Sequence, residues 1–138
     1  MGATTQAFID GVLAALRSGD YRAVPGWLAD EVELNTPRFL KPIRDKRHVV
    51  IVLQTIPRVV EDFHYERTWA TDHEAIMEFR GHIGEIQVHG LDIFALDAAG
   101  KVRELTVFIR PTRAHEALGA AEDALILEQL KKSGATGG

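Results

Sequence analysis

The sequence predicts one α+β domain in which a curved antiparallel sheet wraps around N-terminal helices, followed by a C-terminal helix. Apolar residues recur with helical spacing up to about residue 55, whereas apolar and polar residues alternate between residues 63 and 110. Helices followed by consecutive hairpins are the order expected when such a sheet covers helices. The length of 138 residues suits a single domain with one core.

The first helix is indicated by an amphipathic pattern near the N-terminus. Its apolar side chains recur at i, i+3 and i+4 spacing, at Phe8, Ile9, Val12, Leu13 and Leu16. Gly19 follows as a C-terminal stop. Asp20 can then cap a short second helix, which we expect over residues 21–29.

A short strand and a third helix follow. Residues 31–37 alternate, and Pro37 closes the strand because proline cannot donate a hydrogen bond to a sheet. Asp45 is a suitable N-cap for a helix over residues 45–55. We expect this helix to end before Pro57, since a proline disfavours helical backbone at the preceding residue.

The second half of the chain predicts four strands and one helix. The strands are expected over residues 63–70, 75–83, 86–96 and 101–110. Residues typical of turns separate these four strands at 71–73, 84–85 and 97–100. Residues 112–132 predict a final helix, and residues 133–138 predict a disordered, frayed tail.

Composition and charge exclude several classes of function. A net charge of −4 with interspersed signs provides no basic stripe for a phosphate backbone, so we expect no nucleic-acid partner. The apolar runs are far too short to span a bilayer, and the N-terminus lacks a basic segment before an apolar one. We therefore expect no membrane association and a cytoplasmic location. The absence of cysteine excludes disulfides and thiolate chemistry.

Strand alternation places one acid on an otherwise apolar face. If Ile83 pairs with Ile86 across the turn at 84–85, directly opposed residues share one side of the sheet. That side carries Met77, Phe79, Gly81, Ile83, Ile86, Val88, Gly90, Asp92 and Phe94. Closing the turn at 97–100 in the same way places Leu105 opposite Asp92 and adds Val107 and Ile109 to this face.

Asp92 is the only acid on this face, and a buried acid needs a physical explanation. An ionised carboxylate removed from water must be hydrogen-bonded, paired, or protonated with a raised pKa. Asp92 is therefore either a structural acid paired with an arginine or a backbone amide, or a titrating acid in a ligand site. Gly90 leaves a similar choice open, because its missing side chain provides room for a ligand or permits a bulge.

Several motifs resemble those of a known superfamily. They are Gly19-Asp20, Ala29-Asp30, Asn35-Thr36-Pro37, and the Asp-x-Phe and Gly-Lys-Val runs of the last hairpin. The chain is similar over about residues 5–112 to the SnoaL-like branch of the nuclear transport factor 2-like superfamily. The resemblance implies one SnoaL-like domain over residues 1–138, a cone-shaped, cystatin-like α+β roll with an apolar pocket between sheet and helices. This fold supports many reactions, so the reaction has to be argued from individual residues.

Ketosteroid isomerases of this superfamily provide the first comparison for the pocket. The resemblance places Asp92 at the position of the acid in the oxyanion hole. The general-base position is Thr36, with Asn35 beside it, and neither side chain can abstract a proton. The tyrosine of the first helix corresponds to Val12. Two of the three catalytic groups are therefore missing for that mechanism.

Two further enzyme groups of the superfamily complete the comparison. The limonene epoxide hydrolase pattern is lacking, because its Arg-x-Asp pair becomes Gly90-Leu91-Asp92 and its second aspartate falls at or near Val107. SnoaL-type polyketide cyclases are more similar, since they rely mainly on one pocket aspartate. A single carboxylate is sufficient where the substrate's own carbonyl groups make a C–H bond acidic.

We therefore expect Asp92 to transfer a proton on a small hydrophobic carbonyl compound, without cofactor or metal, in an isomerase, cyclase or lyase reaction. Asn35, Thr36 and Tyr65 are expected to orient this substrate by hydrogen bonds. The other predicted pocket residues are Phe79, Val88, Gly90, Phe94, Leu105 and Val107. The alternative is a non-catalytic ligand-binding or dimerisation module in which Asp92 is structural.

The orientation of two adjacent residues stays open. His64 and Tyr65 lie next to each other in a predicted strand, so only one of them faces the pocket. The turn at 71–73 can close in two registers, and the choice exchanges them. We favour Tyr65 inward because Phe63 shares its side.

Histidines on the outer face raise the question of a metal site. His82 and His89 share that face with Glu78. Their spacing lacks the tight or helical pattern of metal ligands, so we favour solvated histidines over a surface metal.

The outer face also carries an apolar stripe. It consists of Leu91, Ile93, Thr106 and Phe108, with Arg80, Glu104 and Arg110 around it. Apolar patches rimmed by charge are typical of interfaces. We expect a homodimer through this face, in keeping with the superfamily resemblance, and the alternative is that the C-terminal helix packs there.

Overall fold

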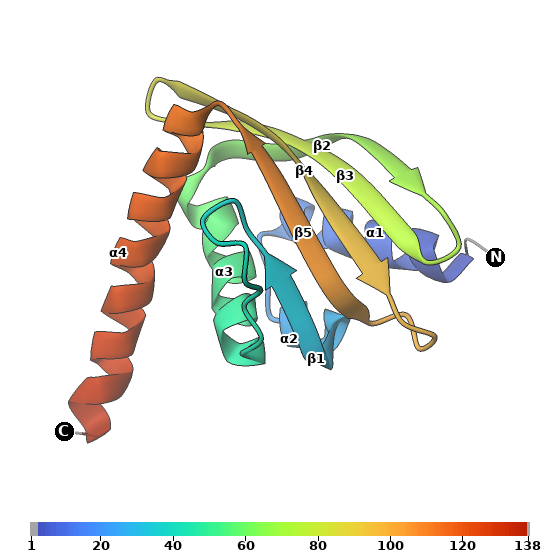
Figure 1. Ribbon diagram of the computed structural model, residues 1–138, viewed down its shortest axis with the longest axis horizontal. Helices are drawn as coiled ribbons and strands as arrows, with labels where there is room; N and C mark the ends of the chain where they lie inside the picture. Colours follow the sequence, from blue (N-terminus) through green and yellow to red (C-terminus); the bar gives the residue numbers. More distant parts are fainter. Residues whose placement is uncertain (1–2, 138) are drawn as a thin grey trace.

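The computed structural model describes residues 3–137, which form an α+β fold around one curved sheet (Figure 1). The elements are α1 (Ala3–Ser18), α2 (Val24–Trp27), β1 (Leu28–Asn35), α3 (Lys46–Val59), β2 (Glu61–Ala70), β3 (Glu74–Ile83), β4 (Ile86–Leu96), β5 (Val102–Arg110) and α4 (Thr112–Gly137). In Figure 1 the sheet arches over α1, α2 and α3, and α4 runs beside α3 at one end. The predicted fold class is confirmed.

The sheet has five strands in the order β1-β5-β4-β3-β2, and it remains open. Strands β2 to β5 pair antiparallel as consecutive hairpins. Strand β1 pairs parallel to β5 at one edge, a feature that the predicted antiparallel sheet did not include. Alternation along residues 31–37 indicates a strand but not the direction of its neighbour, so the sequence pattern alone could not show this pairing.

The register of the β4–β5 hairpin differs from the prediction by two residues. Asp92 opposes Val107, whereas the sequence predicted Leu105 at that position. An irregularity between Ala95 and Leu96, next to the turn, accounts for part of the difference. Because a shift of two residues preserves the side on which a side chain points, the residues stay on their predicted faces.

An irregularity in β2 determines which of its residues point inward. Arg67 opposes Glu78 on the outer face, and Tyr65 opposes Phe79 on the inner face. Residues two apart on a regular strand share a side, so the register shift between Tyr65 and Arg67 reverses the sides. The prediction that Tyr65 points inward is confirmed, and His64 is exposed.

Helix α3 begins as predicted and ends later. The Asp45 side chain accepts a hydrogen bond from the Arg47 backbone N–H at 3.0 Å, which confirms the N-cap. The helix continues past Pro57, so the expected end before this proline is wrong. The proline lies in the last turn, where the Val60 N–H still donates to the Ile56 carbonyl oxygen at 3.0 Å.

Helices α2 and α4 also differ in length from the prediction. Helix α2 is a single turn, because Leu28 already has the extended backbone of β1. Helix α4 continues to Gly137, although the sequence predicted a frayed tail from residue 133. Gly138, the last residue of that predicted tail, lies outside the described residues.

The core lies between the inner face of the sheet and the helices. Its most deeply buried members include Ile9 from α1, Leu34 from β1, Met77 from β3 and Leu105 from β5. Each such side chain contributes about 1.5–3 kcal/mol when it is fully buried. Over residues 3–137, none of the helices combines the length and the apolar character needed to cross a membrane.

Candidate functional site

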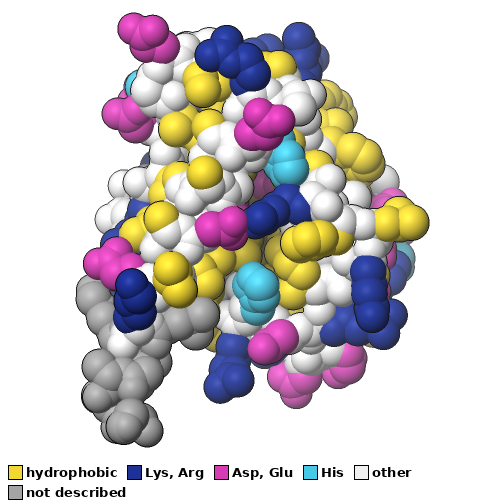
Figure 2. Space-filling view, turned by 60° about the vertical axis from the view of Figure 1, so that its left-hand side comes forward, with side chains coloured by type: hydrophobic (Ala, Val, Ile, Leu, Met, Phe, Trp, Pro, Cys, Tyr) yellow, Lys and Arg dark blue, Asp and Glu magenta, His cyan; other side chains and the backbone are white. Residues whose placement is uncertain are grey.

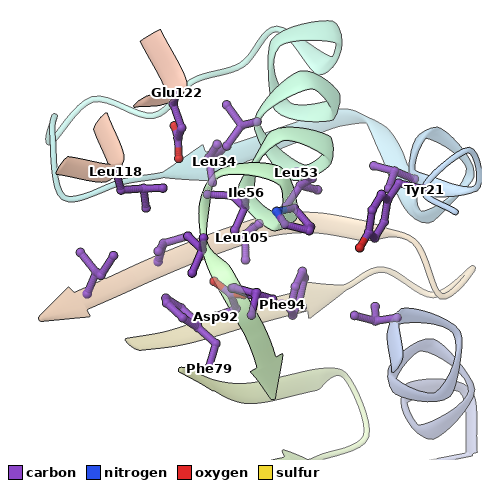
Figure 3. Close-up of a pocket in the computed structure, with 18 of the residues that line it drawn as sticks. Tyr21, Leu34, Leu53, Ile56, Phe79, Asp92, Phe94, Leu105, Leu118 and Glu122 are labelled. Carbon is purple, nitrogen blue, oxygen red and sulfur yellow. The ribbon is translucent and has the colours of Figure 1, made fainter. Parts of the chain in front are cut away.

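A cavity of about 100 Å³ lies between the inner face of the sheet and the helices (Figure 3). One buried water needs only about 10–15 Å³, so the cavity has room for a small organic molecule. Its walls are mainly aromatic and aliphatic side chains from all layers of the fold. The polar side chains among the lining residues are Tyr21, Arg38, Tyr65, Asp92, His115 and Glu122.

Asp92 and Tyr65 form a hydrogen-bonded pair on the sheet side of this cavity. The Tyr65 hydroxyl donates to Oδ2 of Asp92 at 2.6 Å. Asp92 lies in the middle of β4, and only 7% of its surface is exposed. Both residues line the cavity, so a bound molecule would contact them directly.

The surroundings change the acidity of both groups. Burial raises the pKa of Asp92 from 3.8 to about 7, and the hydrogen bond from Tyr65 has a smaller effect in the opposite direction. The pKa of Tyr65 is raised well above 10 by burial first, and then by the charge of Asp92 and the hydrogen bond to it. Both protonation states of Asp92 are therefore accessible near neutral pH.

This pairing differs from the structural alternative considered for Asp92. That alternative required an arginine or a backbone amide beside the carboxylate. Within residues 3–137, no cation forms an ion pair with Asp92, and its hydrogen bond comes from a tyrosine. An unneutralised acid next to an apolar cavity is an arrangement typical of functional sites.

The structure brings six of the predicted site residues together. The cavity is lined by Tyr65, Phe79, Asp92, Phe94, Leu105 and Val107. Val88 is buried on the same face, but it packs with Phe79 and Ala114 in a smaller cluster and is not among the lining residues. Its predicted position at the pocket is therefore wrong.

Gly90 does not provide space for a ligand. A Cβ atom at this position would lie 2.4 Å from Cζ of Phe79 and 2.2 Å from the carbonyl oxygen of Phe108. The pairing of Gly90 with its neighbours on both sides is regular, so the position is not a bulge either. The glycine is needed because the Phe79 ring lies directly against the backbone there.

Asn35 and Thr36 are not among the residues that line the cavity, so their predicted position at the pocket is wrong. The Asn35 amide donates to Glu104 at 3.2 Å and to the Thr106 hydroxyl at 3.0 Å. The Thr36 hydroxyl accepts from the Arg38 backbone N–H at 3.3 Å in an exposed loop. Because Leu34 points into the core, strand alternation directs Asn35 to the opposite face.

Solved structures with this architecture are numerous, although no protein-family model and no curated protein matches the chain. A steroid delta-isomerase from Pseudomonas aeruginosa has a TM-score of 0.87 and 25% identity, covering 94% of this chain and 96% of that one. An uncharacterised protein with a cystatin-like fold from Silicibacter pomeroyi DSS-3 has a TM-score of 0.82 and 24% identity, covering 95% and 90%. An NTF-2 like protein of unknown function from Burkholderia xenovorans LB400 has a TM-score of 0.65 and 16% identity, covering 77% and 82%.

The chain has the nuclear transport factor 2-like fold. The similarity places this protein beside ketosteroid isomerase-like proteins and beside proteins of unknown function. It does not by itself define a reaction, because this fold supports many of them.

A second acid, Glu122 of α4, also lines the cavity, and the sequence analysis missed it. Burial raises the pKa of Glu122 to about 7, while Arg38 lowers it and the neighbouring Asp123 raises it. A signal for its position was present, since Glu122 follows the apolar Leu118 by four residues, and i and i+4 share a helix face. Sequence reasoning confined to the sheet could not identify it.

Arg38 joins the loop after β1 to α4. Its guanidinium donates two hydrogen bonds to the Asp123 carboxylate, at 2.7 and 3.0 Å. This two-point contact lies beside the cavity, which Arg38 also lines. Figure 2 shows blue and magenta side chains next to yellow ones on this side of the molecule. The ion pair therefore links this loop to α4 at one wall of the cavity.

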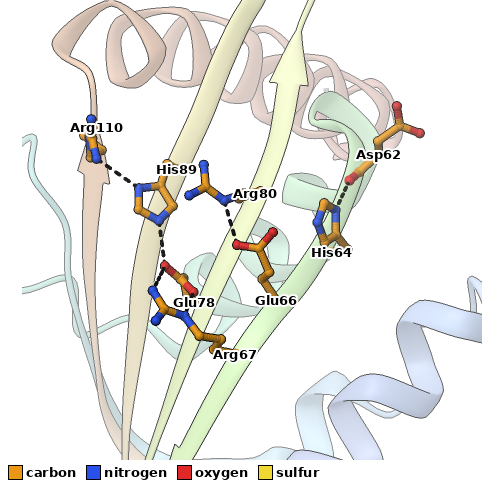
Figure 4. A network of polar contacts seen from close by, with 8 residues as sticks. All are labelled: Asp62, His64, Glu66, Arg67, Glu78, Arg80, His89 and Arg110. Carbon is orange, nitrogen blue, oxygen red and sulfur yellow. Dashed lines mark hydrogen bonds and ion pairs between the residues drawn. The ribbon is translucent and has the colours of Figure 1, made fainter.

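The outer face of the sheet carries a separate polar network (Figure 4). Glu78 accepts two hydrogen bonds from Arg67, at 2.6 and 2.9 Å, and contacts Nε2 of His89 at 2.8 Å. These partners, Arg67 foremost, lower the pKa of Glu78 to about 2. The His82 ring instead contacts Asp62 at 2.9 Å, so it does not join Glu78 and His89.

The described residues contain no cluster of three or more histidine, aspartate or glutamate side chains that could hold a metal ion. The outer face also exposes two large apolar residues, Phe108 at 56% and Trp69 at 46%. Helix α4 does not cover them, because its residues Ala114 and Leu118 pack on the cavity side of the sheet. The alternative in which the C-terminal helix covers the outer stripe is therefore wrong.

Proposed function

We propose that this protein binds a small hydrophobic carbonyl compound in the cavity and transfers a proton on it, in the manner of a SnoaL-like isomerase, cyclase or lyase. No cofactor is needed for this chemistry. The observation that carries the proposal is the Tyr65–Asp92 pair at the wall of an apolar cavity. A carboxyl group whose pKa is raised to about 7 can act as acid or base at neutral pH.

The pair is suited to bind an oxygen atom that gains negative charge. While Asp92 is protonated, its Oδ2 can accept from Tyr65 and its other oxygen can carry the proton. That O–H group can donate to the carbonyl oxygen of the substrate as an adjacent C–H bond ionises. A hydrogen bond to a developing oxyanion is worth more in a site with little water than in bulk solvent. The apolar walls provide such a site.

The test compares wild type with Asp92→Asn and with Asp10→Asn, a matched change of an exposed aspartate on α1. The assay is deuterium uptake at the carbons next to the carbonyl group of small cyclic ketones in D2O, followed by proton NMR. The uptake rate should fall about a hundredfold in Asp92→Asn, within the usual range for a lost acid or base. It should be unchanged in Asp10→Asn. Equal rates in Asp92→Asn and wild type would contradict the proposal.

A specific observation favours a role in assembly as well. We propose that two chains associate through the outer sheet face, because Phe108 and Trp69 expose large apolar surfaces there between charged groups. Phe108→Glu should convert the dimer to a monomer in sedimentation velocity. Leu40→Glu, a control at a fully exposed loop position, should leave it dimeric. A wild-type monomer at all concentrations would contradict this assembly.

The non-catalytic alternative predicts a different result in the ketone assay. A binding module of this fold would hold ketones or phenols in the cavity without accelerating exchange. Binding that depends on Asp92, together with no exchange by wild type, would support that alternative. A cytoplasmic location stays a prediction from the sequence.

A further inference from the structure

Two acids from different layers of the fold line one apolar cavity. Asp92 enters it from strand β4 of the sheet, and Glu122 enters it from helix α4 (Figure 3). In Figure 3 the labelled Glu122 carboxylate lies on the α4 side, across the cavity from the labelled Asp92. A molecule in the cavity would therefore lie between two carboxyl groups.

Arg38, which lines the same cavity as Glu122, is already engaged elsewhere. Both terminal nitrogens of Arg38 donate to the adjacent Asp123, at 2.7 and 3.0 Å. In the described part of the chain, no hydrogen bond or ion pair neutralises Glu122 itself. Arg38 and Asp123 are the charged groups that act on it, and the His115 side chain also lines the cavity wall.

The positions of the two acids suggest different tasks. Asp92 is hydrogen-bonded to Tyr65 and is arranged to hold an oxygen atom. Glu122 is half-buried and carries no such partner, so its oxygens are available to a bound molecule. Pairs of acids in different surroundings are a common way to divide the roles of acid and base within one site.

We propose that Glu122 takes the proton from carbon while Asp92 and Tyr65 hold the carbonyl oxygen, an inference that rests on the proposed function. The substrate class is a carbonyl compound with an acidic C–H bond on the side of the molecule that faces α4. The Glu122 carboxylate removes that proton, and the C–H electron pair forms a C=C bond. The carbonyl π electrons move to oxygen, which receives a hydrogen bond from Asp92. In D2O the Glu122 carboxyl group exchanges its proton with solvent, and return of a deuteron to the same carbon completes exchange. Delivery of the proton to a conjugated carbon instead completes isomerisation, and in both cases the carbonyl group re-forms.

The sequence of α4 supplies a matched control for this assignment. Glu116 lies on the same helix and is exposed, and it is not among the cavity residues. Glu116→Gln therefore makes the same charge change as Glu122→Gln without altering the cavity. Any effect of the lost charge on helix stability or on the electrostatic field of the whole protein should appear in both variants.

The experiment measures deuterium uptake into small cyclic ketones by wild type, Glu122→Gln, Glu116→Gln and Asp92→Asn. We expect uptake to fall about a hundredfold in Glu122→Gln and to be unchanged in Glu116→Gln. Binding of 4-nitrophenol, which mimics an enolate oxygen beside Asp92, should stay within about twofold of wild type in Glu122→Gln. The same binding should be weakened by Asp92→Asn.

The possible outcomes separate this inference from the proposed function. Full uptake by Glu122→Gln with loss in Asp92→Asn would overturn the role of Glu122 and leave Asp92 in place. Full uptake by Asp92→Asn would contradict the proposed function itself, and uptake by wild type no faster than in buffer would overturn both. If Glu122→Gln is unstable by circular dichroism, Glu122→Ala with added formate is the second variant. Restored uptake with formate supports the inference, and no restoration in a folded variant overturns it.

Discussion

Replacing Asp92 with asparagine should make the protein more stable at high pH. The pKa of Asp92 rises from 3.8 to about 7 on folding, a change of about three units. One pKa unit is worth about 1.36 kcal/mol, so this rise corresponds to about 4 kcal/mol in the free energy of unfolding. Because the folded pKa lies above the unfolded value, the stabilising contribution of protonated Asp92 is fully present below about pH 4 and is lost as pH rises through about 7.

Asparagine has nearly the shape of a protonated aspartate and does not ionise. Its side-chain oxygen can still accept the hydrogen bond from Tyr65. We therefore expect wild type and Asp92→Asn to have similar free energies of unfolding near pH 4. Near pH 9 the variant should be more stable by up to about 4 kcal/mol, since the wild-type protein then holds a buried charge.

The assay is urea denaturation at several pH values, analysed as the difference in unfolding free energy between the two proteins. The difference cancels the contributions of other groups whose pKa changes on folding, such as Glu122 and Glu78. Asp10→Asn, at an exposed position, should show no pH-dependent difference from wild type. A constant difference between Asp92→Asn and wild type across the pH range would refute the reasoning that burial controls this acid.

Three further changes test other parts of the site. Tyr65→Phe should raise the pKa of Asp92 further, because the hydrogen bond that lowers it is lost, and carboxyl-carbon NMR would detect the change. Gly90→Ala should destabilise the fold by about 1–3 kcal/mol in urea denaturation, because a backbone oxygen and an aromatic ring already lie within 2.4 Å of the new Cβ. Asp123→Asn should lower the pKa of Glu122, since it removes a neighbouring negative charge and frees a guanidinium, and an unchanged NMR titration would contradict this.

The sheet could be predicted well because alternation is a strict geometric rule. Asp92, Phe94 and Val107 share the inner face as predicted, and even a register error of two residues left them there. The same rule could have excluded Asn35, which follows the inward-pointing Leu34 by one residue. Strand geometry, and not the resemblance at residues 35–37, determines where Asn35 points.

Other features depend on tertiary packing that no local pattern reveals. The irregularity that turns Tyr65 inward leaves no sequence signature of its own, since both registers of the turn were possible. The reason for Gly90 is a ring from the neighbouring strand, which only the paired sheet brings to that position. Glu122 joined the site because α4 packs beside α3, and the helix pattern alone does not specify its neighbour.

The most direct test is a titration of the Asp92 carboxyl carbon by NMR, with the signal assigned by its absence in Asp92→Asn. A midpoint near 7 is expected, and it should shift when a phenol occupies the cavity. A midpoint near 3.8 that does not change with the ligand would contradict the claim that this buried acid titrates near neutral pH and takes part in the chemistry of the cavity.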